Sequence, residues 1–249
     1  MAFLLLLAMI AVQPSAPQQV QLVQIASRTS PSHQSHKIGG FAVKPTQKLV
    51  TLLRPETAYA KPSRQAARLG TISFTRPLTG ERTVLPLLGK WIGPNGVTWL
   101  HVRLPGRPNS HAGWIARSGT KIWKTGWRIV VNIGSRTVTV YDRGRSRAVF
   151  RAVVGSPSTP TPDGQFFVEE VMSLNAGTMG GPYALALSAR SDVYSEFDGG
   201  PGQIALHSTY DIGGTLGTAE SNGCVRLDPS VMSWLAARLG PGVPVTIES

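Results

Sequence analysis

One cysteine and one histidine are the residues of this chain whose types and spacing could carry chemistry. Cys224 is the only cysteine among the 249 residues, and His207 is the only histidine in the C-terminal half. A polar, glycine-rich stretch separates the two. An imidazole can take the proton of a thiol, and the thiolate is the nucleophile in cysteine acyl transfer. The pair therefore predicts a nucleophilic acyl-transfer site.

The residues around Cys224 favour this interpretation. Ser221-Asn222-Gly223 is a turn signal, and the strand-like run Val225-Arg226-Leu227 follows the cysteine. At such a turn, the backbone N–H groups of Gly223 and Cys224 can face a developing oxyanion. Arg226 is expected to lower the thiol pKa. A lone cysteine is often an inert small hydrophobe, so the residue types alone leave a non-catalytic alternative open.

Several motifs together resemble one known family, the L,D-transpeptidase catalytic domain (the YkuD-like fold). The first is His207-Ser208-Thr209, a loop, and then residues 221–227, SNGCVRL. Residues 155–164, GSPSTPTPDG, resemble the family's G-x-P-x-x-P-T-P-x-G turn, and residues 181–185 and 199–207 match patterns of its actinobacterial branch. The resemblance covers about residues 126–249. Asn222 stands where most members have His, and Ser208 where many have Gly.

The resemblance implies a reaction on peptidoglycan. Cys224 would attack the amide between the L-centre of a diamino acid and a terminal D-alanine in a donor stem peptide. His207 would act as general base and then as general acid. The side-chain amine of an acceptor stem peptide would resolve the thioester and form a crosslink. The resemblance also implies that carbapenems acylate the cysteine.

Other residues are assigned supporting roles by the same motifs. Gly223, Asn222, Ser208 and Arg226 are expected to form or support the oxyanion site. Tyr183 and Ser221 are candidates for substrate binding. No cofactor is expected, and no metal, because one Cys and one His cannot close a zinc site. Two alternatives stay open: an L,D-carboxypeptidase or cysteine peptidase on the same site, and a non-catalytic cell-wall-binding protein.

The charge of +12 is unevenly placed along the chain. Residues 1–126 contain 16 Lys and Arg against 2 acidic residues, whereas residues 127–249 contain 9 against 11. The basic half could contact an anionic wall polymer or a membrane surface. It lacks the motifs of nucleic-acid-binding modules, so no specific nucleic acid is expected.

The N-terminal 65 residues are predicted to contain no domain. Residues 1–17 include an apolar run too short for a membrane span and resemble the core of a signal peptide. Export to the cell envelope or beyond is therefore expected. Residues 18–65 are rich in Gln, Ser, Pro and Lys, and they are predicted to be a flexible linker.

Residues 66–123 are predicted to form a small β-barrel. Short strand-like runs at 71–74, 84–88, 99–104 and 113–116 are separated by Gly- and Pro-containing turn signals. Residues 99–115 resemble the bacterial SH3-like module found ahead of this catalytic domain. A wall-binding or spacer role is expected for it.

Residues 124–249 are predicted to form a β-sandwich with one short helix. Strands rich in β-branched residues are expected at 128–133, 137–141, 148–154, 165–171, 183–187, 203–206 and 243–247. Asp228 and Pro229 indicate the start of a helix, and Gly240 its end. Val231, Trp234, Leu235 and Leu239 are expected on its buried face. The fold class is therefore mainly β.

Overall fold

The structure is a computed structural model that describes residues 37–38, 41–175, 177–197 and 199–249. The predicted signal-peptide segment, residues 1–17, lies outside this range, as does the predicted linker up to residue 36. Within the described residues, no helix has both the length and the apolarity needed to span a membrane. The fold is mainly β with one short helix, as predicted.

The C-terminal domain is built on an eight-stranded sheet in the order β12-β11-β10-β19-β14-β15-β16-β18. Its strands are β10 (Trp127–Asn132), β11 (Thr137–Asp142), β12 (Arg145–Arg151), β14 (Gly164–Ser173), β15 (Tyr183–Arg190), β16 (Gln203–Ser208), β18 (Val225–Leu227) and β19 (Pro244–Glu248). β13 (Val154–Gly155) pairs separately with β17 (Ala219–Ser221). The other predicted strands are present, but the one predicted at 148–154 is divided, because β12 ends at Arg151 and β13 begins at Val154 in a different sheet.

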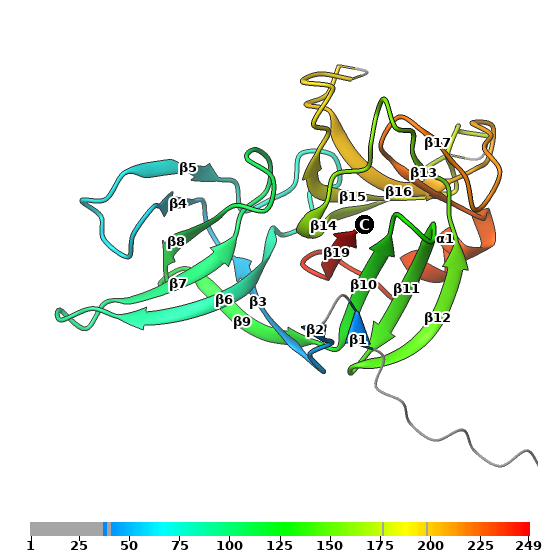
Figure 1. The fold of residues 1–249 in the computed structure, drawn as a ribbon. Coiled ribbons are helices and arrows are strands. Elements are labelled where there is room, and N and C mark those ends of the chain that lie inside the picture. The colour runs from blue at the N-terminus through cyan, green and yellow to red at the C-terminus, as the bar shows by residue number, and fades with distance from the viewer. Residues whose placement is uncertain (1–36, 39–40, 176, 198) are drawn as a thin grey trace, which may run out of the picture. The chain divides into compact units, whose positions relative to one another are not determined.

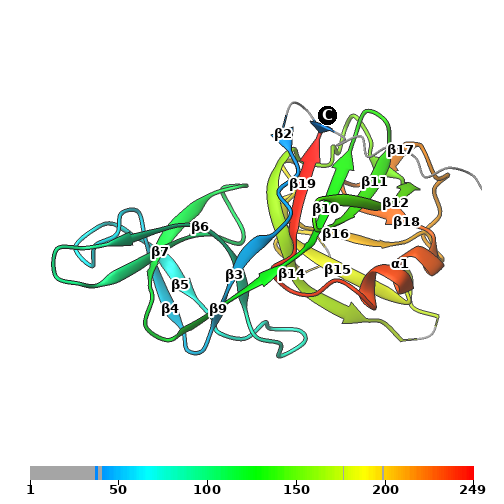
Figure 2. The same ribbon diagram turned by 90° about the horizontal axis from the view of Figure 1, so that it is seen from below.

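The long strand β14 lets the sheet fold into two layers. Its first half pairs with β19, and its second half pairs with β15 across a register shift between Val168 and Glu170. β10, β11 and β12 continue from β19, whereas β16 and β18 continue from β15 (Figures 1 and 2). Side chains from both layers, such as Val140 of β11 and Leu206 of β16, share one buried core. This is the predicted sandwich.

Helix α1 (Pro229–Ala236) packs against β15 and β16. Asp228 is its N-cap, and its carboxylate accepts a hydrogen bond from the Ser230 N–H, as predicted. The helix ends at Ala236, so the predicted end at Gly240 is wrong. Met232 and Leu235 are its buried residues, whereas Val231 and Trp234 are half-buried. Val231 and Trp234 still pack against the core, and Leu239 is buried beyond the end of the helix.

The upstream sheet has seven antiparallel strands in the order β5-β4-β8-β7-β6-β3-β9. They are β3 (Gln47–Leu52), β4 (Glu56–Tyr59), β5 (Arg68–Ile72), β6 (Val84–Ile92), β7 (Thr98–Arg103), β8 (Ala112–Ala116) and β9 (Thr120–Thr125). Two further short strands, β1 (Lys37–Ile38) and β2 (Phe41–Ala42), pair with each other. The four strands predicted for this module are present, and its SH3-like assignment stays a prediction.

The predicted linker extends too far along the chain. Residues 18–65 were expected to be flexible, but β3 and β4 lie within this range. Leu49, Val50 and Leu52 are fully buried, and Ala58 is 1% exposed. The polar composition of the whole stretch hides these short apolar runs, which gain stability only from strands far along the chain. The module therefore begins before residue 66.

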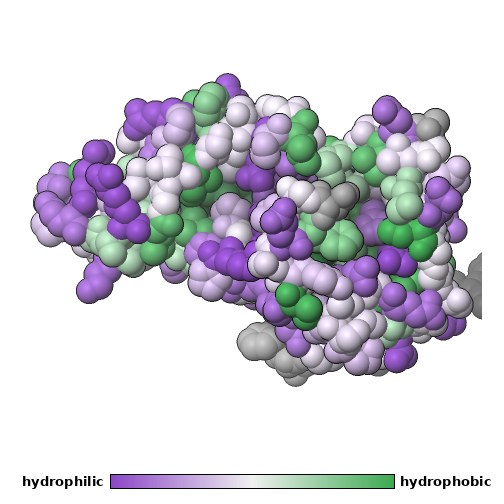
Figure 3. All heavy atoms as spheres, turned by 90° about the horizontal axis from the view of Figure 1, so that it is seen from above, coloured by the Kyte–Doolittle hydropathy of each residue, from purple (hydrophilic) through white to green (hydrophobic). Residues whose placement is uncertain are grey.

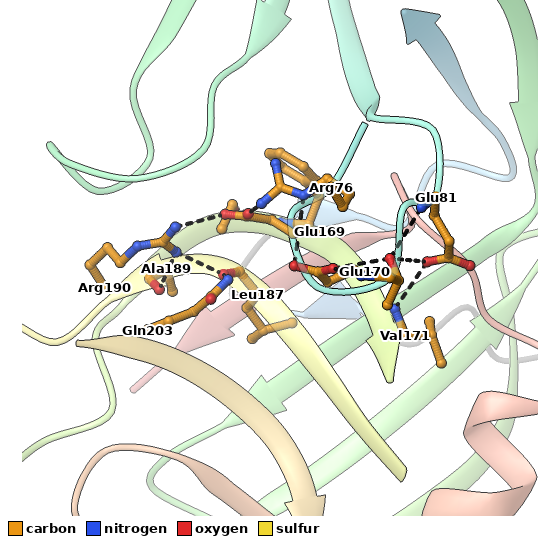
Figure 4. Close-up of polar contacts among 12 residues, drawn as sticks. Arg76, Glu81, Glu169, Glu170, Val171, Leu187, Ala189, Arg190 and Gln203 are labelled. Atoms are coloured by element: carbon orange, nitrogen blue, oxygen red, sulfur yellow. Dashed lines mark hydrogen bonds and ion pairs between the residues drawn. The ribbon is translucent and has the colours of Figure 1, made fainter. Parts of the chain in front are cut away.

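The upstream sheet and the sandwich are joined through buried charges. Residues 35–249 form one compact unit. Arg76, in the β5–β6 connection, forms an ion pair with Glu169 of β14, whose other oxygen lies 3.1 Å from Arg190 of β15 (Figure 4). Glu170 accepts hydrogen bonds from the N–H and the hydroxyl of Thr79 at 3.2 and 3.0 Å. Both glutamates are 1% exposed, so their charges depend on these partners.

Figure 3 shows the hydropathy of the residues on one face of the molecule. Exposed hydrophobic residues there lie in separate patches among hydrophilic ones. Scattered patches of this kind are normal on a soluble surface.

Replacing Arg76 is expected to destabilise the protein strongly. Arg76→Ala leaves Glu169 with one cationic partner and Glu170 with none nearby, inside the protein. Removing one partner of a buried ion pair costs about 3–5 kcal/mol. Urea unfolding would measure this loss. Arg82→Ala is the control, because Arg82 is exposed in the same connection and lies over the Phe74 ring. Equal losses for the two variants would contradict the expectation.

Candidate active site

The parallel pairing of β16 with β18 brings Cys224 and His207 together. Leu206 pairs with Val225 and His207 with Arg226, and Cys224 directly precedes β18. Alternate residues of a strand point to the same face. Leu206 and Val225 are in the core, so His207 and Arg226 point to the opposite face. Cys224, two residues before Arg226, reaches that face as well.

On that face the two residues line one cavity of about 80 Å³. Its walls come from three places: the β15–β16 connection, the ends of β16 and β18, and the loop after β16. The lining residues are Ser191, Tyr194, Phe197, Gly202, Gln203, Ile204, His207, Ile212, Asn222, Cys224 and Arg226. This volume holds a reacting carbonyl and its neighbouring groups. A whole peptide must lie mainly outside it.

The His207 ring is held by a backbone carbonyl. Its Nδ1 lies 2.9 Å from the Ser208 carbonyl oxygen. A carbonyl oxygen can only accept, so Nδ1 carries the proton and Nε2 keeps a lone pair for a general base. Burial lowers the pKa of His207, and the Arg226 charge acts in the same direction. The neutral imidazole, which is the basic form, is therefore favoured.

Gly180 packs against the His207 ring. Its φ is 77°, and a Cβ there would lie 3.0 Å from the ring Nδ1. The Ser208 N–H donates to the Gly180 carbonyl at 2.8 Å, and the buried Ser208 hydroxyl donates to the Gly181 carbonyl. Ser208 therefore supports the histidine through its main chain and its hydroxyl, whereas its expected role at the oxyanion site stays a prediction. Gly180 was not among the residues predicted for the site, although its position in a Gly-Gly pair indicated a tight turn.

The Cys224 thiol is a weaker acid than the sequence suggested. Burial raises its pKa, and the Ala205 backbone and the Arg226 charge oppose this only in part. Arg226 does act to lower the pKa of the thiol, as expected, but the loss of solvation on burial raises it by more. At neutral pH the site therefore holds a neutral thiol beside a neutral imidazole. It becomes nucleophilic by passing the proton to His207 during attack.

The turn before Cys224 uses one of the two expected oxyanion donors for itself. The Gly223 N–H donates to Ser221 Oγ at 3.1 Å, and Ser221 Oγ donates to the Cys224 carbonyl at 2.5 Å. The Cys224 N–H has no hydrogen-bond partner among the described residues. Ser221 is fully buried and does not line the cavity. Its position is that of a turn-former, and the free donor at the turn is Cys224.

Two threonines of the Pro-rich turn hold the nucleophile turn from behind. Thr161 Oγ1 donates to the Gly223 carbonyl at 2.9 Å and accepts from the Gly155 N–H at 2.8 Å. Thr159 Oγ1 donates to the Ser221 carbonyl at 3.0 Å. Both threonines are buried. The sequence analysis recorded this stretch as a motif and did not recognise its residues as supports of the site.

The remaining predicted residues lie at different distances from the chemistry. Arg226 lines the cavity, and its Nη1 donates to the carbonyls of Ile212 and Gly213 at 3.3 and 3.2 Å. Asn222 is exposed and also lines the cavity. Tyr183 is absent from the cavity wall. By alternation along β15 it shares the face of Leu185, opposite to that of His207, so the geometry gives it no contact with the cavity.

Replacing Thr161 is expected to loosen the nucleophile turn. Thr161→Val keeps the shape but leaves the Gly155 N–H and the Gly223 carbonyl without partners, at a cost of about 1–3 kcal/mol. Urea unfolding and the rate of Cys224 modification would both report it. Thr218→Val is the matched control, because that hydroxyl donates only to the Thr215 carbonyl at a less buried position. Equal stability and equal modification rates for the two variants would show that the hydrogen bonds of Thr161 are dispensable.

The pH dependence of thiol modification follows from the two pKa shifts. Because the pKa of Cys224 is raised, the thiolate fraction at neutral pH is below that of a free thiol. Iodoacetamide alkylation is therefore expected to be slower than that of glutathione at pH 7, with a midpoint at higher pH. Arg226→Gln should raise the midpoint further. A midpoint below that of glutathione would indicate a preformed thiolate and refute this arrangement.

Comparison with known proteins identifies the domain that carries the cavity. Residues 126–247 match the family model described as YkuD, L,D-transpeptidase catalytic domain. L,D-transpeptidase 1 of Mycobacterium tuberculosis is 26% identical over 240 residues, covering 86% of this chain and 91% of the relative. The putative L,D-transpeptidase YkuD of Bacillus subtilis is 29% identical over 121 residues, covering 49% of this chain and 65% of the relative.

Solved structures also match. L,D-transpeptidase 3 of M. tuberculosis, in complex with a faropenem-derived adduct, is 18% identical, with a TM-score of 0.44. The match covers 67% of this chain and 91% of that one. LdtMt1 in complex with imipenem is 19% identical, with a TM-score of 0.42 and the same coverage.

Proposed function

Because residues 126–247 belong to the L,D-transpeptidase catalytic domain family, we propose that this protein crosslinks peptidoglycan stem peptides through an acyl-enzyme on Cys224. One observation supports this most directly. Cys224 and His207 line the same cavity, and the Ser208 carbonyl fixes His207 in the tautomer that leaves Nε2 as a base. This is the arrangement that a cysteine acyl transfer requires.

In the acylation step, the Cys224 sulfur attacks the carbonyl carbon of the donor's terminal amide while its proton passes to His207 Nε2. The tetrahedral oxyanion accepts a hydrogen bond from the Cys224 N–H, the donor left free at the turn. The C–N bond then breaks, and His207 gives the proton to the departing amine of D-alanine. A thioester and a neutral imidazole remain.

In the second step, the amine of the acceptor stem peptide attacks the thioester carbon. His207 takes a proton from this amine, the C–S bond breaks, and the thiol is restored with that proton. A new amide joins the two stem peptides. Water in place of the amine would give an L,D-carboxypeptidase, with the same residues in the same roles.

The raised pKa of the thiol and the lowered pKa of His207 fit this sequence. A neutral pair exposes no thiolate to stray electrophiles before the substrate arrives. Attack is then coupled to proton transfer, and the positive charge on His207 exists only while an oxyanion is present to balance it. Arg226, beside both groups, disfavours a resting imidazolium.

The substrate places the reaction on the outer side of the cytoplasmic membrane. We therefore expect export, for which the apolar run within residues 1–17 is a candidate leader. Contact of the basic N-terminal half with an anionic polymer or a membrane stays a sequence-based prediction, as does the role of the upstream module in wall binding.

Carbapenem labelling tests the proposed nucleophile. Incubation with a carbapenem is expected to add one molecule of the drug to the intact protein, because opening of the β-lactam ring leaves it bound to the Cys224 sulfur. Cys224→Ala should show no adduct. His207→Ala should acylate about 10²- to 10⁴-fold more slowly, as expected for the loss of a general base. An equal adduct on Cys224→Ala would place the nucleophile elsewhere.

Donor and acceptor stem peptides then separate the alternatives. Mass spectrometry of the products should show a crosslinked dimer and free D-alanine. Shortened donor without a dimer would indicate a carboxypeptidase. Neither product, together with no carbapenem adduct, would favour the non-catalytic alternative.

A further inference from the structure

The β15–β16 connection forms one wall of the cavity and is held from outside the catalytic domain. The cavity-lining residues of this connection are Ser191, Tyr194, Phe197 and Gly202. Within the described part of this connection, the Ser191 hydroxyl accepts from the Val193 and Tyr194 N–H groups, and the Gly202 N–H donates to the Gly200 carbonyl. The Ser191 N–H donates to the Gly202 carbonyl at 2.7 Å, and Phe197 and Gly200 exchange a pair of bonds at 2.9 Å.

The β7–β8 loop of the upstream module (residues 104–111) adds hydrogen bonds to this connection from outside the catalytic domain. Arg107 Nη2 donates to the carbonyls of Ser191 and Tyr194, both at 2.7 Å, and its Nη1 donates to the Pro201 carbonyl at 2.9 Å. These acceptors lie at the beginning, the middle and the end of the connection. One guanidinium therefore fastens the wall at three points, a task that suits its fixed fork of donors.

Asn109 of the same loop fixes the strand end from which the wall departs. Its Oδ1 accepts from the Arg190 N–H at 2.8 Å, and its Nδ2 donates to the Arg190 carbonyl at 2.7 Å. The side-chain amide thus pairs with both main-chain groups of the last residue of β15, as a neighbouring strand would. The Gly106 N–H adds a bond to the Ser188 carbonyl at 3.2 Å.

The two arginines at this contact, Arg107 and Arg190, each bind acceptors that compensate their positive charge. The Arg190 guanidinium is bonded to Glu169 and to the carbonyls of Leu187 and Ala189. Burial lowers the pKa of Arg190 to about 10, and the nearby charge of Arg107 acts in the same direction. Two cations are thus kept close together, with Arg107 turned toward main-chain carbonyls of the wall.

We propose that Arg107 is a positioning residue for the cavity, through which the upstream module fixes the wall against which the acyl donor binds. This inference rests on the proposed function. Arg107 does not line the cavity, and its side-chain hydrogen bonds to described residues go to the β15–β16 connection, not to His207 on β16 or to Cys224 just before β18. Its loss is expected to release the wall and leave the chemical groups in place. Binding then has to order the wall each time.

The test compares Arg107→Ala with the wild-type full chain in steady-state turnover of a donor tetrapeptide. The donor KM is expected to rise about tenfold, equivalent to about 1.4 kcal/mol, while kcat stays within about twofold. Arg107→Lys should give an intermediate KM, because a single ammonium reaches fewer of the three carbonyls. The matched control is Arg117→Ala, which removes an arginine that bonds only to Thr120 of its own module.

Hydrogen–deuterium exchange keeps the inference separate from the proposed function. Amides of the β15–β16 connection should exchange faster in Arg107→Ala and at the wild-type rate in Arg117→Ala. A wild-type protein that converts no donor would refute the proposed function, and the exchange rates would still decide the role of Arg107. Unchanged exchange, or an unchanged KM in an active enzyme, would overturn the inference. The inference would also be overturned if Arg107→Ala and Arg107→Lys lowered kcat by the same amount and lowered thermal stability by the same amount.

Discussion

The register between β16 and β18 is the constraint on which the site depends. Because side chains alternate along a strand, a slip of one residue would turn His207 into the core and Leu206 out of it. The register is secured on both sides of β18. The Thr209 N–H donates to the Leu227 carbonyl, and Arg226 exchanges two main-chain bonds of 2.9 Å with Val153. Burial of Val225 and Leu227 makes any slip costly.

The turn that presents Cys224 is held by hydroxyl groups and backbone, with little help from packing. Gly223 has a φ of 109°, and a Cβ there would lie 3.0 Å from Ile204 Cδ1, so glycine is required. Thr159, Thr161 and Ser221 bind the turn's carbonyls from the buried side. The Cys224 N–H has no hydrogen-bond partner among the described residues, and it is the donor that the proposed mechanism assigns to the oxyanion.

The upstream module belongs to the structural surroundings of the site. Its β5–β6 connection binds Glu169 and Glu170, whose charges are buried away from water. Its β7–β8 loop binds the wall of the cavity. Both contacts converge on the end of β15, at Arg190. The cavity wall receives additional hydrogen bonds from the neighbouring module, which binds its main-chain carbonyls whatever side chains the wall bears.

Most strands of the sandwich, the helix start at Asp228 and the candidate pair of Cys224 and His207 could be predicted from the amino-acid sequence alone. These are local features: alternation, a cap and two residues in motifs. The sequence pattern misjudged the helix end, because Leu239 is buried by tertiary contacts beyond the last helical turn. It also missed β3 and β4 in the predicted linker, because their partners are distant in the chain.

The assembly of the site and the protonation of its residues depend on long-range packing that the sequence pattern does not reveal. β19 lies between β10 and β14 in the sheet, and each of these two strands precedes it by more than 70 residues in the chain. The weak acidity of Cys224 results from burial, which outweighs the neighbouring Arg226 visible in the sequence. The contacts of Thr161, Gly180 and Arg107 could not be predicted either, because they involve residues far away in the chain. A hydrogen bond to a remote carbonyl leaves no periodic pattern, and desolvation depends on every element packed around a group.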